Sequence, residues 1–352
     1  LNDLAWEVRR QDSSRSLGTA EEALALATSL EYEAGIAYAL LAKAFAQFRL
    51  AKLQEARSSA EKAKRYFKTL DDQQGLLRTY NTLGIVYGES GELLGALRAF
   101  LEADVLCKKL HDKGGEADAL NNIGNVYAYL GDYVSALDYQ LQSLNVSKEQ
   151  GFHEAETRAL LNLGVSYYEM GQYEEALEYL FRTVENNADE EPHLHALALC
   201  NIGRSYEKLA KTDKARMYLE QSLELSKKVN DDLSVSSVLD ALATLTMSLQ
   251  QWDEAHGYLQ QGIMIKDQAG DTRGQSETLI LLGQTCLQQG RLESAATHLQ
   301  EALMITEQVG NKTEQYKAYK HLSDVYKKQG AFERALESYQ TYSRLREEIL
   351  NE

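Results

Sequence analysis

Proline and cysteine are both scarce in this sequence. The only proline among 352 residues is Pro192, so the chain nearly lacks the residue that most strongly breaks helices. The three cysteines, Cys107, Cys200 and Cys286, are odd in number and far apart, which argues against a disulfide framework. We expect reduced thiols that serve as small buried residues in a cytoplasmic protein.

Long apolar runs and an excess of basic residues are also missing. Because no run of 18 apolar residues occurs, we expect no membrane-spanning helix, and no signal peptide is visible. The chain carries 37 basic against 53 acidic residues, a net charge of −16. Phosphate groups bind basic surfaces, so this balance argues against nucleic acid and anionic membranes as partners.

The sequence contains no recognisable catalytic or metal-binding constellation. Only two of the seven histidines, His193 and His195, are close together, and a spacing of two residues on a helix points them apart. No glycine-rich phosphate loop is present. We therefore expect no enzyme activity, no cofactor and no metal.

What the sequence does contain is a repeat with a period of about 40 residues. The segment from Ala119 to Leu144 shows it best, and its markers return throughout the chain. Such a period is typical of a solenoid. One position of the pattern is alanine in eight successive repeats: Ala56, Ala96, Ala136, Ala176, Ala215, Ala255, Ala295 and Ala335.

Each repeat has the pattern of two helices joined by a tight turn. Apolar residues at helical spacing form one face of the first helix, and Gly124 lies inside that face, where the absence of a side chain allows close approach. Gly131 ends the first helix and Ala136 is the small residue expected to cross Gly124. Neither helix buries its apolar stripe alone, so neighbouring repeats must stack.

The markers L-G-x-x-Y followed by G-x-Y/L/F-x-x-A resemble the tetratricopeptide repeat along the whole chain. The ordinary repeat has a period of about 34 residues, and the longer period here is similar to that of kinesin light chains and bacterial signalling and sensor proteins. The resemblance implies an all-α fold: a right-handed solenoid of nine antiparallel helix pairs, with the first pair truncated. We expect residues 1–352 to form one domain.

Three places depart from the pattern. The repeat that holds Ala243 and Gln250 has lost its glycine and tyrosine markers, so any irregularity is expected there. The stretch NNADEEP, which ends at Pro192, is interpreted as an altered loop and not as a hinge. In the last repeat Tyr342 stands where the other repeats have a small residue, and we expect Tyr342, Leu345 and Ile349 to form an uncovered apolar face. This face predicts that the chain continues after residue 352. It also predicts that the last helix self-associates through these three residues.

The resemblance also implies a concave groove lined by the first helices. Counted from the repeat glycine, positions −6, −3, −2, +1 and +5 lie opposite the apolar seam at about 100° per residue. Tyr38, Leu41 and Phe45 occupy this face in the first full repeat and are either an anchor for the partner or the seat of a neighbouring segment. The amide and basic residues predicted to bind a peptide there are Arg78, Asn81, Asn121, Asn122, Asn125, Arg158, Asn162, Asn201, Arg204 and Lys208.

Two interpretations of these asparagines stay open. Asparagine is an indifferent helix former, so its recurrence on one helix face needs a reason. Its amide both donates and accepts, which suits the backbone of an extended peptide, and the same amides can instead bridge adjacent first helices. We favour a scaffold that binds a protein or extended peptide. The alternative is the sensory part of a bacterial signalling enzyme, such as a diguanylate cyclase, whose catalytic domain lies outside this sequence.

Overall fold

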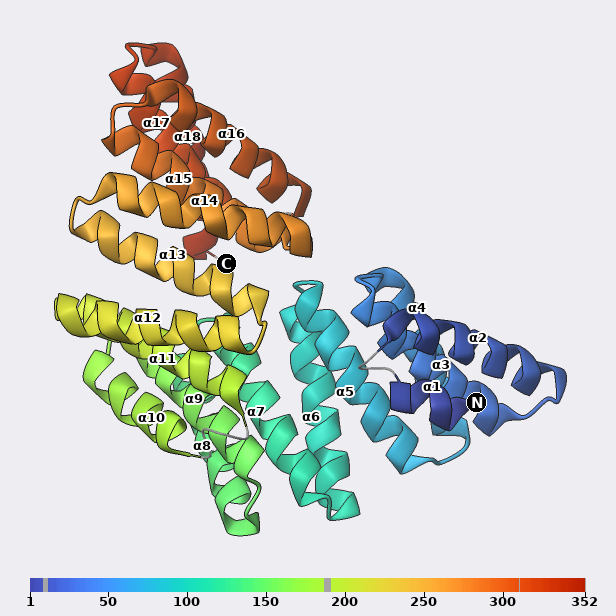
Figure 1. The fold of residues 1–352 in the computed structure, drawn as a ribbon. Coiled ribbons are helices and arrows are strands. Elements are labelled where there is room, and N and C mark those ends of the chain that lie inside the picture. The colour runs from blue at the N-terminus through green and yellow to red at the C-terminus, as the bar shows by residue number, and fades with distance from the viewer. Residues whose placement is uncertain (9–11, 187–190, 310, 352) are drawn as a thin grey trace. The chain divides into compact units, whose positions relative to one another are not determined.

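The computed structural model describes residues 1–8, 12–186, 191–309 and 311–351, and every regular element among them is a helix. Figure 1 shows the helices following one another in antiparallel pairs. The elements are α1 (Asn2–Val8), α2 (Ser13–Ser29), α3 (Glu33–Arg49), α4 (Leu53–Thr69), α5 (Gln73–Glu89), α6 (Leu93–Leu110), α7 (Lys113–Tyr129), α8 (Tyr133–Gln150), α9 (His153–Glu169), α10 (Tyr173–Glu185), α11 (Pro192–Lys208), α12 (Thr212–Lys228), α13 (Asp232–Ser248), α14 (Trp252–Ala269), α15 (Thr272–Gln288), α16 (Leu292–Val309), α17 (Lys312–Lys328) and α18 (Phe332–Asn351).

The chain divides into two compact units, unit 1 (Leu1–Asn186) and unit 2 (Asn187–Glu352). Within each unit every helix packs against the next, and first helices also touch first helices, as α7 touches α9 and α11 touches α13. The predicted all-α solenoid of helix pairs is confirmed, and the first pair is truncated because α1 has only 7 residues. That residues 1–352 form a single domain stays a prediction.

The turns between the two helices of a pair use a residue with positive φ. Gly131 has φ of +79°, and Asp132 then accepts a hydrogen bond from the backbone N–H of Ser135 (3.1 Å), which caps α8. Where the repeat has lost its glycine, Gln250 adopts φ of +60° in its place. The predicted irregular repeat therefore keeps a regular 17-residue α13 and an ordinary turn.

Several first helices carry a glycine where the second helix of the same pair crosses. A Cβ on Gly203 would lie 2.6 Å from Leu219 Cγ and 3.1 Å from the carbonyl oxygen of Ala215. A Cβ on Gly124 would lie 2.7 Å from Gln140 Cγ, and 3.1 Å from the carbonyl oxygen of Ala136. The predicted close crossing of Gly124 and Ala136 is confirmed. It exists because only a bare backbone fits between the two helices.

Pro192, which ends the stretch interpreted as an altered loop, is the first residue of α11, a position that needs no backbone N–H. Residues 187–190 of that stretch lie outside the described residues. Cys107, Cys200 and Cys286 are free and buried, as predicted.

The expectation that Leu345 is uncovered is wrong. Leu345 is only 6% exposed, because α18 turns this side towards the core while it packs along α17. Tyr342 is half-buried and its ring lies 6.0 Å from that of Tyr316. α18 exposes the large apolar side chains of Phe332, Leu336 and Tyr339.

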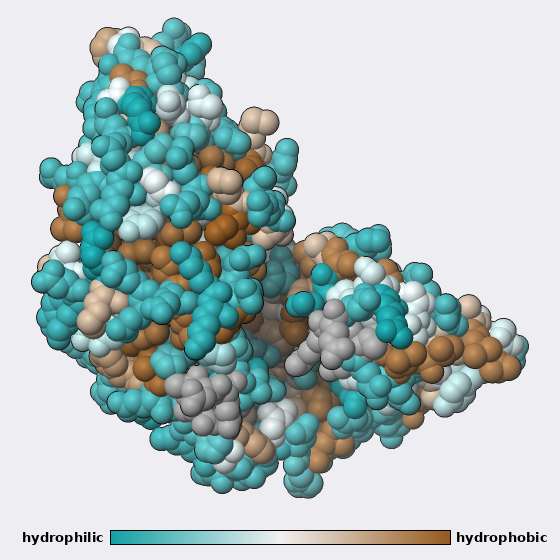
Figure 2. Space-filling model, in the orientation of Figure 1, coloured by the Kyte–Doolittle hydropathy of each residue, from teal (hydrophilic) through white to brown (hydrophobic). Residues whose placement is uncertain are grey.

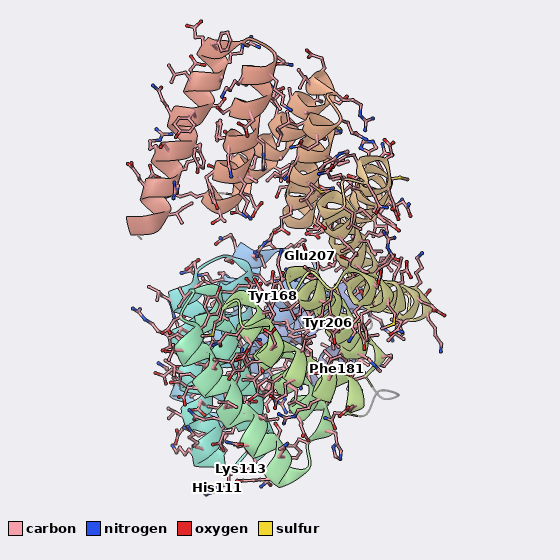
Figure 3. All side chains as sticks on the ribbon, turned by 90° about the vertical axis from the view of Figure 1, so that its left-hand side faces the viewer. His111, Lys113, Tyr168, Phe181, Tyr206 and Glu207 are labelled. Carbon is pink, nitrogen blue, oxygen red and sulfur yellow. The ribbon has the colours of Figure 1, made fainter. Side chains whose placement is uncertain are left out.

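Hydrophilic side chains cover most of the visible surface of both units (Figure 2). The side-chain view shows how the inter-repeat turns carry polar residues outward, with His111 and Lys113 at the turn between α6 and α7 (Figure 3). None of the described helices is both long and apolar enough to cross a membrane.

Candidate functional site

At the start of unit 1, the short helix α1 occupies the predicted apolar surface of α3. The Trp6 ring lies 5.9 Å from the Phe45 ring, and the guanidinium group of Arg78 lies 5.4 Å above the Trp6 ring. Leu41 is fully buried. Of the two predicted roles, the apolar residues of α3 therefore serve as the seat of a neighbouring segment, which is α1. The side chain of Arg78 also contacts α1, through the Trp6 ring.

Further along unit 1, two predicted peptide-binding asparagines bridge adjacent first helices. The Nδ2 of Asn162 on α9 donates to the Oδ1 of Asn121 on α7 at 2.9 Å, and Asn121 is 7% exposed. Arg158 forms ion pairs with Asp118 (3.0 Å) and Glu154 (3.3 Å). The bridging interpretation is correct for this pair, since the amides connect consecutive repeats.

The other three asparagines predicted to bind a peptide in unit 1 are half-buried. Asn125 Oδ1 accepts a long hydrogen bond (3.4 Å) from Gln140, whose own Oε1 accepts from Ser166 Oγ at 2.9 Å. The Oδ1 of Asn81 is buried and has no hydrogen-bond partner, which leaves an unsatisfied acceptor on this surface. Asn122 is also half-buried. These three side chains keep their predicted role in binding as a hypothesis.

The amide bridge predicts a measurable stability difference. Asn162→Ala removes the donor to a buried carbonyl oxygen and is expected to lower the free energy of unfolding by about 1 kcal/mol. Asn122→Ala, at a half-buried position of α7, is the control and is expected to change stability by less than about 0.5 kcal/mol. Urea unfolding followed by circular dichroism measures both; equal values would contradict a structural role for the bridge.

In unit 2 the predicted groove positions line a real pocket of about 520 Å³. It spans the first helices of three consecutive repeats, and α11 contributes two residues of the predicted site, Asn201 and Arg204. Asn201 donates to the carbonyl oxygen of Leu197 (2.9 Å) and accepts from Arg204 (3.3 Å). The full lining is Leu197, Cys200, Asn201, Arg204, Ser237, Asp240, Ala241, Thr244, Lys266, Asp271, Arg273, Gly274, Glu277 and Leu281.

A buried ion pair forms part of the pocket wall. Lys266 of α14 is 3% exposed, and its Nζ donates to Asp240 Oδ2 on α13 and to Thr278 Oγ1 on α15 (2.6 Å). Thr278 in turn donates to Asp240 at 3.0 Å. Gly262 leaves room for this arrangement, because a Cβ there would lie 3.3 Å from Asp240 Oδ1. Three helices are thus held together by polar contacts.

Burial changes the acid–base properties of the wall. It raises the pKa of Asp240, although the neighbouring Lys266 ammonium opposes the rise. Burial also raises the pKa of Glu277, with a smaller contribution from the Glu314 carboxylate. The Cys200 thiol has its pKa raised to about 11 by burial and stays protonated at neutral pH, so it is a poor nucleophile.

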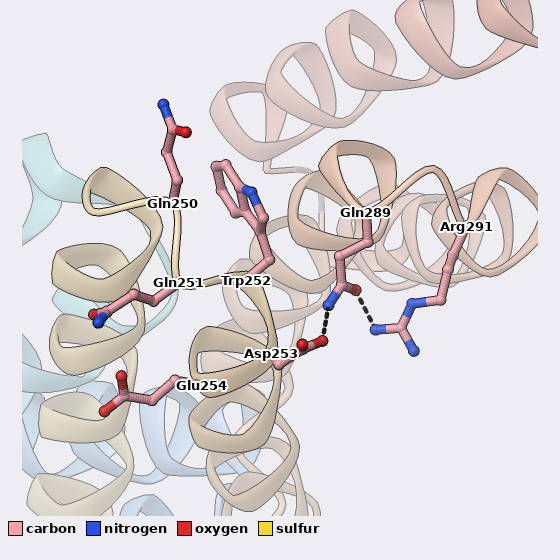
Figure 4. Close-up of a pocket in the computed structure, with 7 residues that line it drawn as sticks. All are labelled: Gln250, Gln251, Trp252, Asp253, Glu254, Gln289 and Arg291. Atoms are coloured by element: carbon pink, nitrogen blue, oxygen red, sulfur yellow. Dashed lines mark hydrogen bonds between the residues drawn. The ribbon is translucent and has the colours of Figure 1, made fainter.

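Two features of unit 2 lie outside this pocket. Lys208, a predicted site residue, is exposed and pairs with Glu207 at 3.0 Å, and it does not line the pocket. A second pocket of about 720 Å³ lies among the turns that begin α14 and α16. Figure 4 shows Gln289 bridging Asp253 (2.7 Å) and Arg291 at its edge, so polar groups of the turns hold one another there.

The charged residues in the wall of the first pocket were not among the predicted site residues. Asp240 lies at groove position −3 of α13, and Glu277 lies at groove position −6 of α15. Counting the groove positions in those two repeats would have identified both residues. Lys266 comes from a second helix, in a column that reads Ala27, Phe67, Cys107, Ser147, Ser226 and Thr306 in other repeats. A lysine in that buried column was the available signal.

Among the described residues, no group of three or more metal-binding side chains comes together. Fold and site together define the class: an α-solenoid of helix pairs whose first helices line a polar pocket. The chain belongs to the tetratricopeptide repeat family, whose sequence model matches residues 115–187, 194–268 and 274–348.

Several solved structures share this fold. The apo quorum sensor NprR from B. thuringiensis is 21% identical with a TM-score of 0.69, over 98% of this chain and 97% of that one. A Rap protein in complex with Competence and Sporulation Factor is 15% identical with a TM-score of 0.69, over 99% and 97%. The Rap conjugation gene regulator of plasmid pLS20 in complex with the Phr* peptide is 17% identical with a TM-score of 0.61, over 80% and 76%. No curated protein matches the sequence.

Proposed function

We propose that this chain is a non-catalytic binding module that takes an extended peptide segment, and that the unit 2 pocket is the centre of its binding surface. The observation that carries this proposal is the pocket of about 520 Å³ lined by the groove positions of α11, α13 and α15. The apolar seam does not need these positions, so their side chains face the pocket and can contact a ligand there.

The chemistry of the lining suits a peptide. Leu197 and Leu281 offer apolar contact, while Asn201 and Thr244 offer groups that hydrogen-bond to a peptide backbone. Arg204, on the α11 side, suits an acidic side chain or a terminal carboxylate of the peptide. Binding in this mode combines backbone hydrogen bonds with one charged contact.

The comparisons add support at the level of the fold. A structure of similar fold is a complex with the Phr* peptide, and another is a quorum sensor. We extend peptide binding from such proteins to this chain as part of the proposal. The net charge of −16 further supports a protein or peptide partner over nucleic acid.

A displayed library of random peptides tests the proposal. Peptides enriched on the immobilised protein are labelled and titrated by fluorescence polarisation. The double variant Asn201→Ala/Arg204→Ala is expected to bind them at least tenfold more weakly, about 1.4 kcal/mol, because it removes the amide and the cation of the α11 wall.

The matched control removes an arginine from the outer surface of the same unit. Arg216 on α12 pairs with Glu254 at 2.9 Å and does not line the pocket, so Arg216→Ala is expected to leave peptide affinity unchanged. Circular dichroism must show equal helix content in all variants. The proposal fails if no peptide is enriched, or if the double variant and the control bind equally well.

A further inference from the structure

A pocket of about 400 Å³ lies in unit 1, where α4, α5 and α6 meet. Its base is formed by Leu83 and Ala99, which are 1% and 5% exposed, and the half-buried rings of Tyr80 and Tyr87 pack beside them. We refer to this space as the α4–α6 pocket. None of the residues predicted to bind a peptide lines it, so it is separate from that surface.

The α4–α6 pocket lies where later repeats hold an aromatic ring. In three of them a tyrosine of the first helix stacks on a tyrosine 12 residues further along, with ring centroids 5.2 to 5.6 Å apart: Tyr127 on Tyr139, Tyr167 on Tyr179, and Tyr206 on Tyr218. In the α5–α6 pair the first ring is Tyr87, and Ala99 stands where the second ring would be. The place of one aromatic ring is therefore left open beside Tyr87.

A second small residue of α6 lines the same pocket. Gly95 lies one turn before Ala99, and a Cβ there would lie 3.1 Å from Tyr87 Cγ. In unit 2 this position of the repeat is Lys214, whose Nζ lies 5.2 Å from the centre of the Tyr206 ring. Two positions that carry larger side chains in another repeat are thus reduced in α6, and both reductions are at the pocket.

Two charged side chains at the pocket are available to a ligand. Arg98 and Glu102 of α6 line it and are exposed, and neither makes a hydrogen bond or ion pair with another described residue. They are four residues apart, so their Cβ atoms are about 6 Å apart, and a cation that precedes an anion at this spacing pairs less well than the reverse order. The other charged residues of the lining are paired within the chain at 2.6 Å, Arg57 with Glu92 and Lys64 with Glu61.

We propose that the α4–α6 pocket binds an aromatic amino acid. The ring of the ligand takes the place of the missing tyrosine over Ala99, beside Tyr87. Its carboxylate pairs with Arg98 and its ammonium group pairs with Glu102. The two charged groups of an amino acid are attached to one carbon, so they suit opposite charges that are one helical turn apart.

The size of the pocket agrees with this ligand. Small-molecule sites have volumes of about 300–1,000 Å³, and the α4–α6 pocket is at the lower end of that range. Its lining combines an apolar base, aromatic rings and a few polar groups, as such sites do. This site goes beyond the proposed peptide binding, which belongs to unit 2.

Isothermal titration calorimetry of the full chain with L-phenylalanine, up to about 10 mM, detects a Kd in the millimolar range or tighter. We expect L-phenylalanine to bind, and L-leucine, which lacks the ring, to bind at least about tenfold more weakly. Ala99→Tyr introduces the residue that α8, α10 and α12 carry at this position, so the variant should fold and lose binding. Ala99→Ser, with the residue found at this position of α4, is the matched control and should bind as the wild type does. Circular dichroism monitors folding.

Charge variants test the two ionic contacts. Arg98→Ser should weaken L-phenylalanine binding about tenfold and leave the affinity for phenethylamine, which lacks the carboxylate, unchanged. Glu102→Gln should likewise weaken L-phenylalanine and leave 3-phenylpropionate, which lacks the ammonium group, unchanged.

The proposal is overturned if L-phenylalanine does not bind, if L-leucine binds equally well, or if Ala99→Tyr binds like the wild type. It is also overturned if a charge variant weakens both of its ligands alike, because the ionic contacts would then be wrong. Peptide binding in unit 2 is measured separately and does not depend on these results.

Discussion

Replacing Lys266 by methionine is expected to lower the free energy of unfolding by about 3–5 kcal/mol, because it leaves the Asp240 carboxylate buried without its cation. Methionine has a similar length and fills the space of the lysine stem, so the loss is mainly electrostatic. Urea unfolding of the wild type and the variant at pH 8 measures the difference.

The double variant Lys266→Met/Asp240→Asn is the control for this effect. It removes both charges, so most of the lost stability is expected to return. If Lys266→Met is no less stable than the double variant, the ion pair does not hold the three helices together.

The pH dependence of Lys266→Met gives a second measurement. A carboxyl group whose pKa is raised in the folded state binds its proton more tightly there, so stability is lost as pH rises through the interval between the ordinary and the raised pKa. Without the lysine the pKa of Asp240 rises further. The variant should therefore lie closer to wild type at pH 5 than at pH 8, and Asp240→Asn should abolish that difference.

Gly203→Ala and Leu219→Ala are expected to show strong coupling. Leu219 is fully buried, and its loss should cost about 2–5 kcal/mol. Gly203→Ala places a Cβ 2.6 Å from Leu219 Cγ and should cost about 1–3 kcal/mol through overpacking. In the Leu219→Ala background the clash with Leu219 is gone and only the 3.1 Å approach to the carbonyl oxygen of Ala215 is left, so the second substitution should cost clearly less than it does in the wild type.

Gly257→Ala is the matched control for this cycle. Gly257 lies in α14 of the same unit, and a Cβ there would meet no atom within 4 Å. Alanine should stabilise that helix by about 0.5–1 kcal/mol through helix propensity alone. Additive effects of Gly203→Ala and Leu219→Ala in urea unfolding would contradict the close crossing of α11 and α12.

The fold was predictable because the repeat encodes it locally. Gly124 and Ala136 allow the two helices of one pair to cross closely, and Gly131 supplies the positive φ of the turn between them. The same requirements recur about every 40 residues. The repeat that lacks the glycine and tyrosine markers forms the same helix pair. Its apolar residues are sufficient for α13, and Gln250 adopts the positive φ of the missing glycine.

For the candidate site, the sequence predicted which face of the first helices carries it but not which of its side chains are available to a ligand. Helical periodicity assigns Asn121, Asn162, Asn201 and Arg204 to the groove side, and the structure places them on the first helices as expected. Periodicity does not tell whether an amide is used within the solenoid. Asn162 reaches Asn121 only because α7 and α9 lie side by side, a contact between residues 41 apart in sequence.

The sequence by itself determined the class of fold, the positions of the helices and turns, and the face of each first helix that the core does not need. Those features depend on interactions within one repeat, and such interactions leave a period in the sequence. Only the tertiary structure decided that Lys266 joins Asp240 and Thr278, and that Leu345 is buried. Each of these depends on how neighbouring helices are turned towards one another, which no single repeat specifies.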